Sequence, residues 1–313
     1  MIEQTNIDEY IELCRIFGGS YDLVQTNGGN ISIKNKNKII IKRSGFKMIE
    51  TEMNKGYVIC DINKIDFTNE NIENSVISGQ GTPSIETFFH LLPKKYIVHL
   101  HPIILLHYLS LNNWKEDISN IFENCLYIEY KKPGLELSRS ILDTYNNESI
   151  IFLQNHGIIL CSDNKDDIYI LINNILNKFT SRFPSTNILF MRDLYFKLKD
   201  KIIISSYIPF LKSDRYFFKL SPDISLYLDD SPIIFETSHY DLNFDLTKKI
   251  IIYNDIVYLV DINFNKVKNL EEMVKSYYLV LECGFNNDYH EISDEDKIAL
   301  ERWDKEKLRL NSK

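Results

Sequence analysis

Residues 81–102 read Gly-Thr-Pro-Ser-Ile-Glu-Thr-Phe-Phe-His-Leu-Leu-Pro-Lys-Lys-Tyr-Ile-Val-His-Leu-His-Pro. The apolar run 96–98 predicts a short β-strand, which ends in the His-x-His pair of His99 and His101. Because side chains at positions i and i+2 of a strand point to the same face, both imidazoles project into one site. Two neutral imidazoles side by side suit a borderline-soft divalent metal such as zinc. The stretch therefore predicts a metal site.

A third metal ligand is expected at His156, in the run Phe-Leu-Gln-Asn-His-Gly over 152–157. Three protein ligands and one open position are typical of a catalytic zinc site rather than of a closed structural one. Taken alone, a His-x-His pair on a strand is a weak signal, because buried histidines are often only hydrogen-bonded. Of the chain's seven histidines, however, four fall in these segments, at positions 90, 99, 101 and 156.

The residues Thr82, Pro83 and Ser84 predict the start of a helix, because a hydroxyl cap precedes a proline in the first turn. The free amides of that turn and the helix dipole favour a bound anion, so the turn is a candidate phosphate site that also positions Glu86. His90 follows one turn later on the same helix face. We interpret it as a packing residue or as one that supports the metal ligands, and a further metal ligand is the alternative.

Two upstream segments carry glycines beside predicted strands. The first, Asn-Gly-Gly-Asn-Ile-Ser-Ile-Lys over 27–34, puts two adjacent glycines before an alternating strand, which lets backbone amides approach a ligand closely. By itself this pattern also fits a plain hairpin turn. The second, Arg-Ser-Gly-Phe over 43–46, puts a hydroxyl and a glycine amide at a strand end, a common way to hold a phosphate.

The composition narrows the class of protein. The chain has 313 residues, 44% hydrophobic and 26% charged, which is typical of a soluble globular protein with one large domain or two. Its net charge of −8 argues against a nucleic-acid or anionic-membrane partner. No apolar run approaches the ~20 residues of a membrane span, and the N-terminus does not resemble a signal peptide. Five scattered cysteines without CxxC spacing indicate reduced thiols and a cytoplasmic location.

The pattern of the chain changes near residue 185. Before it, apolar spacing predicts helices over 6–18 and 163–183 and a buried strand over 149–153 that delivers His156. After it, strands dominate 201–260, with a hairpin formed by 250–253 and 256–259, and helices are expected over 270–283 and 293–310. We therefore expect two domains, 1–190 and 191–313, with the second, an α+β extension, packed on the first.

Several of these motifs occur together in one order and spacing. They are Gly-Gly-Asn-Ile-Ser (28–32), Ser-Gly (44–45), Pro-Ser-Ile-Glu-Thr (83–87), His-Leu-His-Pro (99–102) and Asn-His-Gly (155–157). Over about residues 1–190 they resemble the class II sugar-phosphate aldolase/adducin-head family. In wording they look closest to the aldolase part of bifunctional rhamnulose-phosphate aldolase/alcohol dehydrogenases, although the chain has no Gly-x-Gly-x-x-Gly of a dehydrogenase.

The resemblance implies a three-layer α/β/α fold with a mixed, largely antiparallel central sheet, and a homotetramer. It assigns His99, His101 and His156 to a divalent metal, usually zinc, and makes Glu86 the catalytic acid/base. The substrate phosphate pocket would be lined by Gly29, Asn30, Ser44, Gly45 and Ser84.

The reaction that the resemblance implies is metal-dependent cleavage or formation of a C–C bond in a phosphorylated ketose or related sugar, through an enediolate. The same metal site also serves decarboxylases, dehydratases and epimerases acting on sugar phosphates. A third alternative is a non-catalytic, adducin-like interaction module. This chain departs from the family at Ile85, where some members have serine, and it has no tyrosine that aligns with the family's proton donor.

Overall fold

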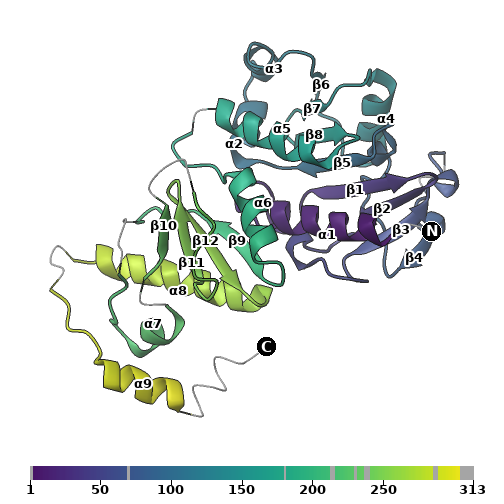
Figure 1. The fold of residues 1–313 in the computed structure, drawn as a ribbon. Coiled ribbons are helices and arrows are strands. Elements are labelled where there is room, and N and C mark those ends of the chain that lie inside the picture. The colour runs from purple at the N-terminus through teal and green to yellow at the C-terminus, as the bar shows by residue number, and fades with distance from the viewer. Residues whose placement is uncertain are drawn as a thin grey trace. The chain divides into compact units, whose positions relative to one another are not determined.

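The structure is a computed structural model that describes residues 3–68, 71–179, 181–211, 216–228, 231–235, 240–284 and 288–303. The chain divides into two compact units, Met1–Phe190 and Met191–Lys313. Each unit is built around a β-sheet of its own (Figure 1). None of the helices formed by the described residues combines the length and the apolar character that a membrane crossing requires.

The first unit contains an eight-stranded sheet with the order β4-β3-β2-β1-β5-β8-β7-β6. Its strands are β1 (Asn30–Asn35), β2 (Lys38–Lys42), β3 (Tyr57–Asp61), β4 (Val76–Gly79), β5 (Tyr96–Leu100), β6 (Leu126–Ile128), β7 (Ile150–Leu153) and β8 (Gly157–Ser162). Neighbouring strands are antiparallel except β6 and β7, which are parallel. The sheet is therefore mixed and largely antiparallel, as predicted.

Helices cover both faces of this sheet (Figure 1). They are α1 (Gln4–Gly18), α2 (Ile103–Leu109), α3 (Trp114–Ser119), α4 (Leu135–Thr144) and α5 (Lys165–Lys178). On one face α1 and α5 pack together, with the Tyr169 hydroxyl donating to Glu12 at 2.7 Å. On the other face Leu137 and Ile141 of α4 join Ile97 of β5 in one buried core. The predicted three-layer α/β/α fold is confirmed.

The prediction of a helix that starts at residues 82–84 is wrong. Residues 84–92 instead form a succession of tight turns that ends in a single 3-10 turn, η4 (Phe89–Leu91). Their hydrogen bonds join each amide to the carbonyl three residues earlier, for example Thr87 N to Ser84 O at 3.0 Å. Pro93 follows directly and has no amide to continue the ladder, so the segment is too short for an α-helix. It carries no helix N-terminus for a phosphate.

Helix α5 ends at Lys178, five residues before its predicted end. Residues 181–183 are described and are not helical, and Pro184 follows them. The C-cap residue Phe179 is already extended, with a φ of −95° and a ψ of 135°, and Pro184 disfavours a helical conformation only for residue 183.

The second unit contains a four-stranded sheet with the order β10-β11-β12-β9. Its strands are β9 (Ile202–Ser206), β10 (Ile233–Phe235), β11 (Ile250–Tyr253) and β12 (Ile256–Asp261). Its helices are α7 (Pro222–Tyr227), α8 (Phe264–Glu282) and α9 (Asp294–Arg302), and α6 (Ile188–Lys197) spans the division between the units. The predicted hairpin is present as the antiparallel pair of β11 and β12.

Helix α8 begins six residues before its predicted start, because Asn263 caps it by accepting the amide of Lys266 at 2.9 Å. Of the helix predicted over 293–310, the part 304–310 lies outside the described residues.

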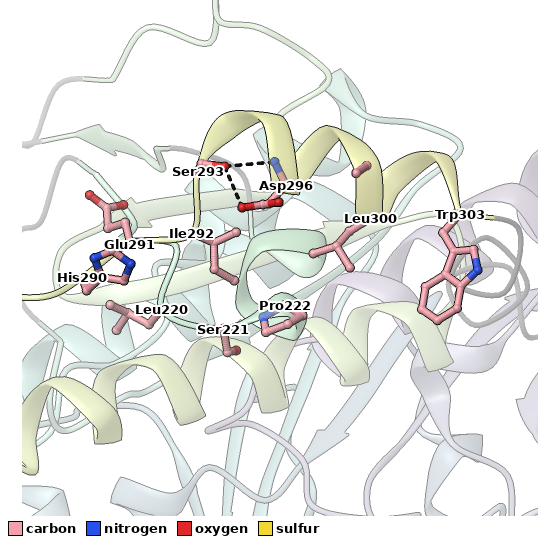
Figure 2. Close-up of a pocket in the computed structure, with 11 residues that line it drawn as sticks. Leu220, Ser221, Pro222, His290, Glu291, Ile292, Ser293, Asp296, Leu300 and Trp303 are labelled. Atoms are coloured by element: carbon pink, nitrogen blue, oxygen red, sulfur yellow. Dashed lines mark hydrogen bonds between the residues drawn. The ribbon is translucent and has the colours of Figure 1, made fainter.

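A pocket of about 850 Å³ lies in the second unit, lined by the residues that precede α7 and α9 and by one side of α9 as far as Trp303 (Figure 2). Apolar side chains such as Leu220 and Leu300 line it together with Trp303. Its two hydroxyl groups belong to helix caps: Ser221 Oγ accepts the amide of Ile224, and Ser293 Oγ accepts that of Asp296. These hydroxyls are therefore engaged in starting the two helices.

Candidate active site

Three histidines meet on the first unit. His99 lies on β5, His101 follows that strand, and His156 lies in the turn between β7 and β8. One ring nitrogen of each lies within 4.8 Å of those of the other two. The Nε2 atoms of His99 and His101 are 2.9 Å apart. The neighbouring positions of β5, β8 and β7 in the sheet bring together histidines that are more than fifty residues apart in sequence.

Two glycines make room for the ring of His101, and the sequence patterns did not identify this role. A Cβ atom at Gly28 would lie 2.9 Å from Nδ1 of His101, and one at Gly157 would lie 2.9 Å from its Cδ2. At Gly157 that Cβ would also come within 2.3 Å of the Leu100 carbonyl oxygen. The signal was present in the sequence, because Gly157 directly follows His156 and Gly28 begins the Gly-Gly-Asn motif.

His99 and His101 are held in the neutral form that a metal requires. Burial lowers the pKa of His99 well below its ordinary value and that of His101 to about 4. The Nδ1–H of His99 donates to the carbonyl of Ile158 at 3.0 Å, which leaves its Nε2 unprotonated and facing the cluster. The same carbonyl contact fixes the orientation of the ring.

The cluster fits a divalent metal in its donor set and its spacing. Two imidazole nitrogens bound to one tetrahedral zinc lie about 3.3 Å apart, close to the 2.9 Å between His99 and His101. The buried Nδ1 of His156 has no hydrogen-bond partner among the described residues, as expected of a site short of one binding partner. The residues present therefore suit a three-histidine metal site.

The carboxylate of Glu86 lies against this cluster. Its oxygens are 3.6 Å from Nε2 of His99 and 3.2 Å from Nε2 of His156. Burial raises the pKa of Glu86, but His99, His156 and the Asn30 amide together lower it by more, so the carboxyl remains ionised well below its usual range. An ionised carboxylate beside three histidine side chains can accept a proton from a bound ligand.

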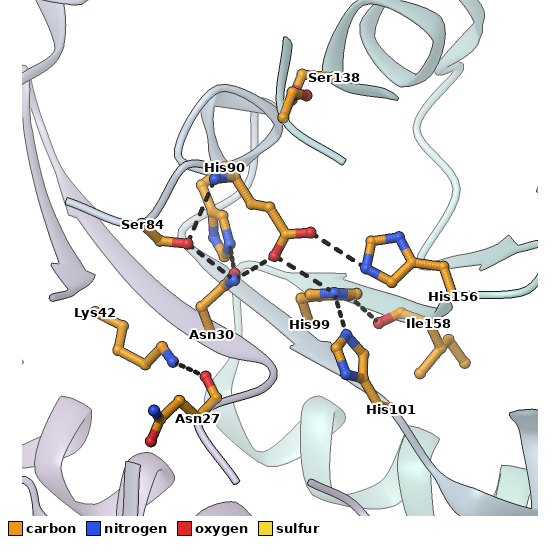
Figure 3. Close-up of polar contacts among 12 residues, drawn as sticks. Asn27, Asn30, Lys42, Ser84, His90, His99, His101, Ser138, His156 and Ile158 are labelled. Carbon is orange, nitrogen blue, oxygen red and sulfur yellow. Dashed lines mark hydrogen bonds and ion pairs between the residues drawn. The ribbon is translucent and has the colours of Figure 1, made fainter. Parts of the chain in front are cut away.

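Asn30 joins Glu86 to the rest of the site (Figure 3). It lies directly opposite His99 in the pairing of β1 with β5. Its Nδ2 donates to Glu86 at 2.6 Å and to the Ser84 hydroxyl at 3.2 Å. His90 contacts Asn30 and Ser32 and lies outside the three-histidine cluster.

The candidate phosphate residues lie on three adjacent segments. The end of β2 runs beside residues 82–84, with Ser44 N donating to Thr82 O at 2.8 Å and Ser84 N donating to Lys42 O at 3.0 Å. Gly45 is exposed at a φ of +72°, and its position faces open space. Gly29 has a φ of +63°, and a Cβ there would lie 2.8 Å from the His99 carbonyl. Position 29 accommodates only glycine easily. The glycine allows its loop to lie against β5, the strand that carries His99.

Lys42 was not identified from the sequence as part of the site. Its side chain is buried, and its Nζ donates to the carbonyl oxygen of Asn27 (Figure 3). It also donates to the carbonyl oxygen of Phe46 at 3.1 Å. The ammonium group thus ties the two glycine-containing loops to each other. Burial lowers the pKa of Lys42. A lysine that ends the apolar run of β2 was the available signal.

Known proteins resemble the first unit. The sequence model of the family described as "Class II Aldolase and Adducin N-terminal domain" matches residues 8–176. An L-fuculose phosphate aldolase of Methanococcus maripaludis is 27% identical over 176 residues, which are 53% of this chain and 88% of the relative. Another L-fuculose phosphate aldolase, from Methanocaldococcus jannaschii, is 24% identical over 52% of this chain and 88% of the relative.

Among solved structures, the N-terminal class II aldolase domain of a conserved protein from Thermoplasma acidophilum is 22% identical, with a TM-score of 0.49. The match covers 63% of this chain and 96% of that one. The family model covers more than half of the chain, and its span contains the three histidines, Glu86 and both glycine-containing loops. The chain therefore belongs to the class II aldolase and adducin N-terminal domain family.

Proposed function

We propose that this protein is a metal-dependent aldolase that cleaves or forms a C–C bond in a phosphorylated ketose or a related sugar. The observation that carries the proposal is the position of the Glu86 carboxylate against a cluster of three histidines. The names of the two relatives, both L-fuculose phosphate aldolases, support the substrate class.

His99, His101 and His156 would hold the metal, for which zinc is the first candidate because the ligands are three imidazoles. A bound divalent ion supplies a Lewis acid that polarises the ketose oxygens and stabilises negative charge on them. The neutral state of His99 and His101 and the ring orientation of His99 prepare these ligands for that ion.

Glu86 would move the proton at the carbon next to the ketose carbonyl. In the direction of synthesis it accepts that proton, and in the direction of cleavage it returns it after the C–C bond has broken. The hydrogen bond from Asn30 holds one carboxylate oxygen, Oε2, and the other oxygen lies closest to His156. Each carboxylate oxygen thus has a fixed direction.

Gly29, Asn30, Ser44, Gly45 and Ser84 would bind the substrate phosphate. This assignment is supported by the hydrogen bonds that hold the end of β2 beside residues 82–84. It is also supported by the exposure of Ser44 and Gly45 beside buried Ser84. Backbone amides at glycines and serine hydroxyls are hydrogen-bond donors of the kind that phosphate oxygens accept. Lys42 adds a positive charge beneath these loops.

We further propose that the protein is a cytoplasmic homotetramer. All five cysteines are free, as is usual in a reducing compartment. The homotetramer is the assembly that the resemblance to the class II aldolase family implies. Sedimentation analysis of the purified protein tests this, and a monomer at micromolar concentration would contradict it.

The proposed metal site is tested by elemental analysis of the purified protein beside two histidine variants. About one divalent ion per chain is expected, lost in His101→Ala and retained in His107→Ala, whose imidazole is exposed on α2. A screen of phosphorylated ketoses for release of an aldehyde then tests the reaction. A protein that neither contains nor takes up a metal would contradict the proposal.

A further inference from the structure

Three polar side chains lie at alternate positions of β1: Asn30, Ser32 and Lys34. Alternate residues of a strand face the same side, and the partners of Asn30 and Ser32 on β5 are His99 and Ile97. These polar side chains all contact the segment 84–92 that carries Glu86. The polar face of one strand therefore holds the segment with the proposed base.

The contacts form a continuous chain of hydrogen bonds. The Ser32 hydroxyl lies 2.8 Å from Nδ1 of His90, and Nε2 of His90 contacts Oδ1 of Asn30. Asn30 then donates from Nδ2 to Glu86. Ser32 and His90 are fully buried and Asn30 is 2% exposed, so water does not compete with these bonds.

The donor and acceptor roles in this chain of hydrogen bonds can be followed back from Glu86. Asn30 donates its NH2 group to Glu86, and its carbonyl oxygen lies against Nε2 of His90, so the donors run from His90 through Asn30 toward Glu86. Nε2 of His90 then carries the hydrogen, and Nδ1 accepts from the Ser32 hydroxyl. Burial lowers the pKa of His90 to about 3, so the ring is neutral and carries a single N–H.

We propose that His90 is a positioning residue for the reaction, since its Nε2–H holds the Asn30 amide in the orientation that donates to Glu86. Without that donor the amide is free to turn, and its oxygen would then face the carboxylate. Lys34 supports the arrangement from the same strand face, donating from Nζ to the carbonyl of His90 at 2.8 Å and to that of Leu92. The inference deepens the proposed function and rests on the role of Glu86 as the base.

The first experiment needs no substrate. With only seven histidines in the chain, ¹⁵N-histidine labelling gives few ring signals, and those of His90 are identified by their loss in His90→Gln. We expect the Nε2–H tautomer and no protonation between pH 8 and 5.5. Ser32→Ala should shift the Nδ1 signal and leave Nε2–H in place. A proton on Nδ1, or titration within this range, would overturn the proposal.

The second experiment compares two amide variants of His90. The amide nitrogen of Gln occupies about the position of Nε2 and still donates to Asn30, whereas that of Asn reaches only the position of Nδ1. His90→Asn should lower kcat by about 10- to 100-fold with little change in KM. His90→Gln should remain within a few fold of the wild type, and both variants should retain their metal.

Equal losses of kcat in the two variants, or loss of metal in both, would mean that His90 has a merely structural role. The two proposals fail in different ways. If the wild-type protein turns over no ketose phosphate, the proposed function is wrong, while the tautomer of His90 still decides whether the hydrogen-bond chain exists.

Discussion

At the scale of single residues, the site brings together one carboxylate, Glu86, and three imidazoles, those of His99, His101 and His156. Glu86 lies near Nε2 of both His99 and His156, and the Nε2 atoms of His99 and His101 face each other at 2.9 Å. Burial keeps the imidazoles of His99 and His101 neutral while the carboxyl stays ionised. Neutral ligands and an anionic base at one point are the combination that metal-assisted proton transfer needs.

Glu86→Gln should separate metal binding from proton transfer. The amide is nearly the same size as the carboxylate but cannot accept a proton, so turnover is expected to fall by about 10²- to 10⁴-fold. The three histidines are unchanged, so elemental analysis should still find the metal. Turnover equal to that of the wild type would rule out Glu86 as the base.

Buried neutral His90 should make the metal-free protein less stable in mild acid. The unfolded histidine has a pKa near 6.5 and the folded one about 3. As the pH falls below 6.5, the unfolded chain therefore binds a proton that the folded chain does not. The contribution of neutral His90 to the free energy of unfolding is therefore present above pH 6.5 and is lost as the pH falls toward the pKa of the folded state. Between pH 6.5 and 5.5 this loss is about 1 kcal/mol.

Urea unfolding of the metal-free protein at these two pH values measures this loss. The matched control is His90→Gln, whose side chain does not titrate and whose stability should depend less on pH by about the same 1 kcal/mol. The same pH dependence in both proteins would show that His90 is not held neutral.

At the scale of elements, the site depends on how closely strand ends approach one another. The turn between β7 and β8 carries His156, and Gly157, the first residue of β8, lies against the end of β5. Asn155 in this turn has a φ of +53°, a conformation that asparagine tolerates better than most residues. In the sequence Asn-His-Gly, Asn155 forms the turn, His156 is the proposed ligand, and Gly157 lets the backbone of β8 lie close to that of β5.

Gly157→Ala should disturb both stability and metal binding. The new Cβ would lie 2.3 Å from the Leu100 carbonyl, so the backbone of β5 or β8 must shift, at a cost of about 1–3 kcal/mol. Because Leu100 lies between His99 and His101, zinc affinity measured by competition with a chelator should fall as well. Gly284→Ala is the control, since its Cβ would face open space in the second unit. Unchanged zinc affinity in Gly157→Ala would contradict this account.

At the scale of the whole molecule, all proposed ligands belong to the first of two compact units. Zinc should therefore stabilise this unit by mass action, by about 2.7 kcal/mol at a free concentration one hundred times the Kd. The two tryptophans report separately, because Trp114 is buried in the first unit and Trp303 is half-exposed in the second.

In a Trp303→Phe variant the fluorescence of Trp114 should show a higher unfolding midpoint when zinc is present. The same variant carrying His101→Ala should show no shift. A zinc-dependent shift that survives the loss of His101 would indicate binding elsewhere.

The sequence alone determined the features that depend on local pattern. The same-face placement of His99 and His101 follows from the period of a strand, and the hairpin of β11 and β12 follows from two short apolar runs around Asn254 and Asp255. The largely antiparallel sheet and its three layers came from the resemblance that the ordered motifs carry.

Only the tertiary structure decided the features that depend on long-range contact. Residues 84–92 have a helix-like start, but Pro93 and the polar face of β1 leave them as tight turns. The buried positions of Lys42 and His90 depend on carbonyl and amide partners from other strands, and no local periodicity encodes those partners. A sequence pattern reports neighbours within a few residues, whereas burial and charge at this site are set by chain segments that only folding brings together.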